Sequence, residues 1–302
     1  MFTEPFYKAR TIGDNIDVTF GFIRENIKTV VKTAMLFSIP ICVIMEVLYV
    51  FNVIEETADY SYNSYADEAY TWGTMDTIIF MGILVNLIII MPLALSIINI
   101  NYNRKGGTEN ITMKEAWKYI KPNLGKSIIM PFSQLALCLV PIFIIIAFTG
   151  EFRFLTYSFL VFLFFIITAN SLPAYCIGKH SYSTSISKGF SYGFSKLFVI
   201  LGFSILMILV GSLIYLWEIG AMELMDNYLV EFLGTDISGN LAAYIVFWII
   251  KGALWALITV SVNLAVMAVT IGLAFQFGSF EEKNCHIELK KKIENFDNLK
   301  ES

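Results

Sequence analysis

The sequence predicts an all-α membrane protein with six transmembrane helices, and three observations lead to that fold class. Of the 302 residues, 57% are hydrophobic and only 15% are charged, whereas a soluble domain carries about 25% charged residues. The apolar residues gather in six long runs. Basic and acidic residues lie in alternate connections between those runs. A chain of this composition cannot bury its apolar surface in a core of its own, so we expect lipid to be its solvent.

Each expected span follows from its length and apolar content. Crossing about 30 Å of hydrocarbon at about 1.5 Å per residue takes about 20 residues, and only helices can cross, because lipid offers backbone amides no partner. The six spans are expected at residues 30–53, 75–100, 127–149, 153–177, 197–218 and 255–277. Together they make residues 1–278 a transmembrane domain, followed by a charged cytoplasmic tail at 279–302.

The last apolar stretch, residues 241–277, is longer than one crossing needs. Lys251 and Gly252 interrupt it. We therefore expect a break at this pair, with residues 241–254 forming an interfacial segment on the outer side and Lys251 reaching water.

The distribution of charge predicts the orientation. Nineteen of the 21 Lys and Arg residues lie before or at the start of the first span, in the second or fourth connection, or after the last span. The first and fifth connections are acidic instead. By the positive-inside rule, both termini of a multi-pass protein of the cell inner (cytoplasmic) membrane should face the cytoplasm.

A half-polar segment stands before three of the apolar runs. The three copies are DVTFGFIRENIKTVVK (17–32), KEAWKYIKPNLGKSII (114–129) and SISKGFSYGFSKLFVI (185–200). Their apolar residues recur at helical spacing, which predicts amphipathic helices in the headgroup layer near 12–28, 112–125 and 184–196. Thr112 followed by Glu115 predicts a capping box at the start of the second. On this interpretation, the chain comprises three repeats of an interfacial helix plus a helical hairpin. The alternative is that membrane helices are commonly preceded by a basic amphipathic segment, without any repeat.

Six polar residues fall inside or beside the spans and are the candidate site residues. They are Glu46, Asn86, Gln134, Asn170, Lys251 and Asn263. Asn86 and Asn263 come at similar depths, as do Gln134 and Asn170, so each pair could hydrogen-bond across helices. Such amides either hold helices together or line a transport path. Glu46 and Lys251 either form an ion pair or reach water separately.

Catalytic and cofactor motifs are missing from the sequence. It contains no HExxH, Walker A, GxSxG or GxGxxG pattern. The four cysteines are far apart and form no CxxC pair. We therefore expect a protein that is not an enzyme and that holds neither a cofactor nor a metal.

Two stretches carry a family resemblance. NSLPAYCIGKHSYSTSISKGFSYGFSKLF (170–198) and RTIGDNIDVTFGFIRENIKTV (10–30) resemble bacterial membrane proteins related to the membrane domain of glycerophosphodiester phosphodiesterases. An acid often follows the Pro-Ala pair in that family, where this chain has Ile177, Gly178 and Lys179. The resemblance implies a six-helix integral membrane protein. The soluble phosphodiesterase domain is not among these residues, so we do not expect its activity.

These observations favour a non-enzymatic inner-membrane protein that acts as a scaffold or as a subunit of an envelope complex. The alternative is a transporter or lipid-handling permease, because kinked spans and repeats often build transporter folds. The expected partners are membrane lipid and another membrane or envelope protein, and not nucleic acid. The sequence leaves the substrate, the partner and the oligomeric state open.

Overall fold

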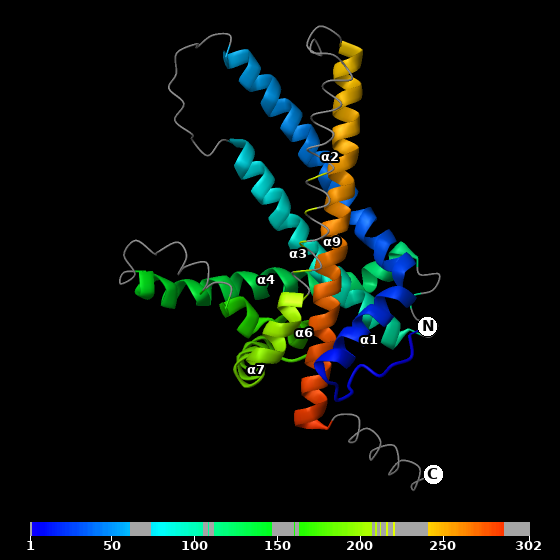
Figure 1. The fold of residues 1–302 in the computed structure, drawn as a ribbon, viewed down its shortest axis with the longest axis vertical. Coiled ribbons are helices and arrows are strands. Elements are labelled where there is room, and N and C mark those ends of the chain that lie inside the picture. The colour runs from blue at the N-terminus through cyan, green and yellow to red at the C-terminus, as the bar shows by residue number, and fades with distance from the viewer. Residues whose placement is uncertain are drawn as a thin grey trace. The chain divides into compact units, whose positions relative to one another are not determined.

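The computed structural model is mostly helical over the residues that it describes, with no strand among them (Figure 1). It describes residues 2–60, 74–104, 112–146, 163–206 and 241–286, together with single residues at 108, 160, 209, 212, 216 and 220. The helices are α1 (Ile12–Glu25), α2 (Ile27–Tyr60), α3 (Thr74–Asn103), α4 (Met113–Ile146), α6 (Ser171–Cys176), α7 (Tyr182–Ser195) and α9 (Leu241–Cys285). The all-α fold class is therefore confirmed.

The described helices include fewer membrane-crossing candidates than the six expected. Ile27–Ile44 and Gly252–Cys285 are long and apolar enough to span a membrane by themselves. A third candidate arises if Tyr182–Ser195 and Leu197–Leu206, which meet at a 90° bend, count as one span. Parts of the expected spans 75–100, 127–149, 153–177 and 197–218 lie outside the described residues or side chains. Two or three spans is thus the number that the structure supports.

The helix starts follow from local capping. In α1, the Thr11 hydroxyl accepts a hydrogen bond from the Asp14 N–H (3.2 Å). The Asp14 carboxylate accepts one from the Thr11 N–H (3.0 Å). This backbone hydrogen bond lowers the pKa of Asp14. The cap therefore stabilises the fold fully at pH values above the usual pKa of an aspartate. Its contribution is lost as the pH falls through the lowered pKa of Asp14 in the folded protein. Thr112 and Glu115 form the same box (3.1 and 3.3 Å), which confirms the predicted cap of α4.

Two of the amphipathic segments form helices of equal length. Both α1 and α7 have 14 residues. Asn26 is the C-cap of α1 and Lys196 is the C-cap of α7. A new helix begins at the residue after each cap. By contrast, α4 runs from Met113 to Ile146 without a break near residue 126. Asn123, which aligns with Asn26, donates to the Tyr119 carbonyl from within the uninterrupted helix (3.4 Å).

The expected break at Lys251–Gly252 is absent, because α9 is one helix from Leu241 to Cys285. A glycine inside a helix costs about 1 kcal/mol relative to alanine, which is too little to end a long helix that contains no proline and has no capping residue at that point. Residues 241–254 are therefore the first turns of α9. The helix also extends past residue 279, so the expected tail begins later than predicted.

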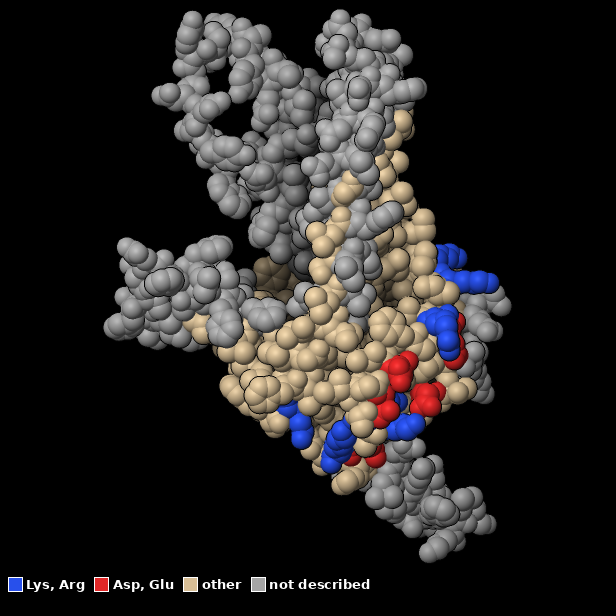
Figure 2. Space-filling model, viewed as in Figure 1, with Lys and Arg blue, Asp and Glu red and all other residues tan. Residues whose placement is uncertain are grey.

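The chain divides into two compact units. Unit 1 comprises residues 1–30, 91–208 and 267–302, and unit 2 comprises residues 31–90 and 209–266. Of the charged side chains that the structure describes, all but Lys32 belong to unit 1. Figure 2 shows basic and acidic groups close together on one face of the described surface, amid uncharged residues. In the full sequence, 19 of the 21 Lys and Arg residues belong to unit 1, so the basic residues gather in one of the two units.

The core of unit 1 is aromatic. Phe2, Phe22 and Phe275 meet one another with ring centroids 5.3 to 6.0 Å apart. They come from the N-terminal segment, α1 and α9. The side-chain amide of Asn101 in α3 donates to the Phe2 carbonyl (3.2 Å). The first residues of the chain are thus held by three helices that lie far apart in the sequence.

Small residues let α7 pack directly on the chain before and within α6. A Cβ added at Gly189 would lie 1.8 Å from the Ser171 hydroxyl oxygen, and one added at Gly193 would lie 2.0 Å from the Ile167 carbonyl oxygen. Gly189 and Gly193 are four residues apart, as are Ile167 and Ser171, which they contact. This spacing lets the two backbones approach closely, as in small-xxx-small contacts between membrane helices. No larger side chain fits at either glycine.

We predict that Gly193→Ala lowers the stability of the purified protein by about 1–3 kcal/mol, the usual cost of overpacking. The added methyl group must push α7 away from a backbone carbonyl that cannot turn aside. The measurement is thermal unfolding in a mild detergent. Gly202→Ala is the control, because a Cβ there meets nothing within 4 Å, and it should leave the melting temperature equal or higher. Equal losses in the two variants would contradict the packing argument.

Candidate functional site

The structure buries three of the six predicted site residues, and Gln134 and Asn170 do not form the hydrogen bond expected between them. Gln134 donates from its side-chain amide to the Thr168 carbonyl (3.0 Å). Asn263, in unit 2, donates to the Ser38 hydroxyl. Asn170 is fully buried, and neither polar atom of its amide has a hydrogen-bond partner among the described residues. The side chains of Glu46, Asn86 and Lys251 lie outside the described residues.

A network of charged side chains lies instead near the end of α9, in unit 1. The carboxylate of Glu281 has 2% of its surface exposed and lies 2.6 Å from the Lys188 ammonium of α7. It also accepts a hydrogen bond from the Tyr192 hydroxyl, and the His180 Nε2 lies 3.7 Å from its other oxygen. Since a buried carboxylate needs a cation and donors around it, this network fixes α7 and the preceding loop against α9.

A buried arginine holds the N-terminal segment against the same part of α9. The backbone N–H of Arg10 donates to the Ser279 hydroxyl (2.9 Å), and the Lys283 ammonium donates to the Arg10 carbonyl (2.6 Å). Its guanidinium donates to the Phe6 carbonyl (3.1 Å) and lies over the Phe275 ring, 5.5 Å from the centroid. The guanidinium therefore closes residues 5–10 into a loop with a defined shape.

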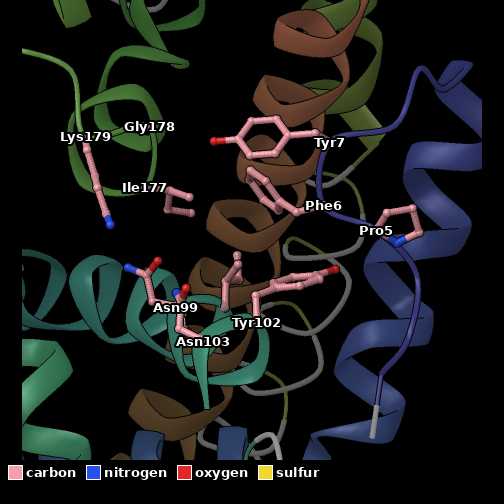
Figure 3. Close-up of a pocket in the computed structure, with 10 residues that line it drawn as sticks. Pro5, Phe6, Tyr7, Asn99, Tyr102, Asn103, Ile177, Gly178 and Lys179 are labelled. Carbon is pink, nitrogen blue, oxygen red and sulfur yellow. Dashed lines mark hydrogen bonds between the residues drawn. The ribbon is translucent and has the colours of Figure 1, made fainter. Parts of the chain in front are cut away.

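A pocket of about 470 Å³ lies beside these two networks, entirely within unit 1 (Figure 3). One wall is the N-terminal segment, the second is the last turns of α3, and the third is the loop after α6. The lining residues are Pro5, Phe6 and Tyr7, then Ile98, Asn99, Tyr102 and Asn103, and then Ile177, Gly178 and Lys179. Its volume lies within the range of about 300–1,000 Å³ that is usual for small-molecule sites.

Lys179 is the charged residue of the lining, and its backbone is unusual. Its φ angle is +53°, in the left-handed region that costs a residue with a Cβ about 1–2 kcal/mol. Its ammonium makes no hydrogen bond or ion pair with any described residue. In Figure 3 the side chain extends toward Asn99 and Asn103. Strained residues of this kind cluster at functional sites.

The hydroxyl groups of the pocket are donors rather than anions. Burial, and then the negative charge of Glu281, raise the pKa of Tyr7. The Tyr102 hydroxyl donates to the Glu4 carbonyl (2.6 Å). Both tyrosines therefore stay protonated at neutral pH, and the pocket itself carries no negative group.

The lining of the pocket presents a cation, amides, hydroxyl groups and apolar side chains to a ligand. Glu281, the carboxylate that could act as a base, is 1% exposed, so a substrate has no direct access to it. The described residues contain no group of three or more His, Cys, Asp or Glu side chains that could hold a metal ion.

Sequence reasoning missed the Glu281 network because it assigned residues 279–302 to a charged cytoplasmic tail. Glu281 follows the buried Phe277 by four residues, which places both on one face of a helix. This four-residue spacing could have indicated that Glu281 is buried on the same helix face as Phe277. The glycines at 189 and 193, with their four-residue interval, were a second signal.

Comparisons with family models, with curated proteins and with solved structures find no match to this chain.

We predict that Glu281→Gln destabilises the protein by about 3 kcal/mol, because it leaves the partly buried Lys188 without its counter-ion. Glu4→Gln is the matched control. Glu4 lies 2.9 Å from Lys8, but about half of each side chain is exposed, so the loss should stay below about 1 kcal/mol. Chemical denaturation in detergent measures both. A Glu281 variant as stable as the Glu4 variant would show that the buried pair contributes nothing.

Proposed function

We propose that the chain is a non-enzymatic, six-helix integral protein of a bacterial inner membrane, with both termini in the cytoplasm, and that it serves as a scaffold or subunit of an envelope complex. The observation that carries the proposal is the separation of charge described above. Of the 21 Lys and Arg residues in the sequence, 19 belong to unit 1, which also contains the N-terminal segment and the end of α9. Basic segments stay on the cytoplasmic side of a membrane.

The exposed apolar surface supports the membrane part of this proposal. Only 17% of the 18 residues in Ile27–Ile44 are buried. Exposed residues in this stretch include Met35, Leu36, Ile39 and Val43. A soluble monomer rarely leaves so large a contiguous apolar surface in water, whereas lipid stabilises it.

The scaffold role is supported by the bonds that the buried amides make. Gln134 binds a backbone carbonyl of the segment before α6, and Asn263 binds Ser38 of α2. These are hydrogen bonds between helices, of the kind that holds membrane bundles together. The pocket contains neither residue in its lining. The equal lengths and similar ends of α1 and α7 support the repeat architecture.

Topology and partner can be tested on whole cells. We predict that cysteines introduced at Lys8 and at Lys283 react with a membrane-impermeant maleimide only after the inner membrane is permeabilised, because both positions should be cytoplasmic. The three native cysteines that the structure describes are free thiols, so all four native cysteines are replaced first. A cysteine at Asp59, in the acidic first connection, is the control that should react in spheroplasts. Labelling of either terminal position before permeabilisation would overturn the orientation.

The scaffold role itself predicts a stoichiometric protein partner. Cross-linking in the membrane, followed by extraction in mild detergent and mass spectrometry, should recover one protein at a constant ratio from independent preparations. Recovery of the chain by itself in every preparation would contradict this role without affecting the topology.

One observation favours the alternative, a transporter or lipid-handling permease. Asn170 buries an amide with no described hydrogen-bond partner, and such a group costs stability unless something binds it. A path through the helices would supply water or a substrate group at this position.

We predict that Asn170→Leu leaves the melting temperature equal or higher if the amide only packs, since an apolar group of similar volume removes an unsatisfied polar group. Gln134→Leu is the comparison. It breaks a described hydrogen bond and should cost about 1 kcal/mol. Destabilisation by Asn170→Leu that equals or exceeds this loss would favour the path.

A further inference from the structure

The pocket beside the Arg10 and Glu281 networks has the features of an anion site. Lys179 is the charged residue of its lining, and it has no ion-pair partner among the described residues. Neighbouring cations of unit 1 are occupied. Lys188 pairs with Glu281, Lys126 donates to the Tyr175 carbonyl, and Lys283 donates to the Arg10 carbonyl. The ammonium of Lys179, by contrast, makes no hydrogen bond or ion pair with the residues that the structure describes.

Neutral donors surround the same space. The side-chain amide of Asn103 donates a hydrogen bond to the backbone carbonyl of Asn99 (2.8 Å), which fixes the last turn of α3. The side-chain amide of Asn99 makes no hydrogen bond with the residues that the structure describes. In Figure 3, Lys179 extends toward both asparagines, and the Tyr7 hydroxyl points into the same opening. A cation with amide and hydroxyl donors is a suitable set for a tetrahedral oxyanion.

The negative charges near the pocket are already compensated. Glu281, behind Tyr7, lies 2.6 Å from Lys188. Glu4 lies 2.9 Å from Lys8. The lining itself therefore keeps a formal charge of about +1 from Lys179, and an incoming anion meets no unpaired carboxylate among the described residues.

The apolar part of the lining indicates what the anion is attached to. Phe6, Ile98 and Ile177 are apolar side chains of the lining, here called the apolar floor, and they can contact the carbon atoms of a ligand. The pocket also lies where the apolar residues 163–176 give way to the polar loop. If the proposed topology holds, this is the level of the cytoplasmic headgroups.

We propose that the pocket formed by residues 5–7, the end of α3 and residues 177–179 binds a phosphate ester, with Lys179 as its charged ligand. The phosphate oxygens lie at the Lys179 ammonium and the Asn99 amide, and the ester carbons lie on the apolar floor. The source is either the headgroup of an anionic phospholipid or a soluble phosphate compound. This site does not depend on the scaffold role, which concerns a protein partner.

The test measures binding to the full chain in a neutral detergent by microscale thermophoresis. The probes are short-chain phosphatidylglycerol, short-chain phosphatidylcholine and inorganic phosphate. We expect phosphatidylglycerol to bind at least about tenfold more tightly than phosphatidylcholine, whose headgroup has no net charge. Inorganic phosphate that competes with the lipid at comparable concentration would identify a soluble phosphate compound as the source. Failure of all three probes to bind would overturn the proposal.

Variants at Lys179 separate binding from folding. Lys179→Asn removes the charge but tolerates the left-handed backbone, so it should weaken lipid binding by about tenfold or more while the melting temperature without lipid stays equal or rises. Lys179→Arg keeps the charge and should retain most of the affinity. Lys118→Gln, which removes an exposed lysine outside the pocket, is the control.

Unchanged affinity in Lys179→Asn, or an equal loss in Lys118→Gln, would show that the pocket is not the binding site. Neither result bears on the protein partner sought by cross-linking, so the two proposals can fail separately.

Discussion

Glu281 keeps a carboxylate almost completely out of water, and the described part of unit 1 is arranged around that charge. A lone buried carboxylate is unfavourable by several kcal/mol, so the fold must bring a cation to it. Lys188 does this at 2.6 Å, and Tyr192 adds a hydrogen bond from the next turn of α7. The position of α7 is then set by electrostatics on one side and by the close approach of Gly189 and Gly193 on the other. Neither constraint leaves the helix free to slide.

Two of the three walls of the pocket, the N-terminal segment and the loop after α6, derive their shape from this frame. His180 near Glu281 fixes the end of the loop that carries Lys179. Arg10, fixed to Ser279 on the same helix, fixes the N-terminal segment that carries Tyr7. The strained backbone of Lys179 can persist because the residues on either side of it are held independently. A rigid frame thus positions a single accessible cation, which is how a small site gains selectivity without many charged groups.

The sequence predicted the all-α fold and the Thr112–Glu115 cap, because apolar run length and capping chemistry are local properties. Burial of individual amides such as Gln134 followed from the same runs. The Glu281 network could not be derived, since it joins α7 to α9 across more than 90 residues and depends on where two helices meet. The uninterrupted α9 differs from expectation for a related reason. A glycine after a lysine weakens a helix locally, but the following apolar turns continue it.

Stability and function therefore make opposite demands on the same residue type in this chain. A lysine that stabilises the fold, such as Lys188, already forms an ion pair with a carboxylate, so it cannot attract a ligand. A lysine that binds a ligand must remain unpaired, and in an apolar protein that leaves a charge uncompensated until the ligand arrives. Lys179 meets this demand at the edge of the apolar region, where water solvates it in the free state. Deeper positions, such as that of Asn170, are occupied by uncharged amides. An unpaired cation there would destabilise the protein by more free energy than ligand binding could supply.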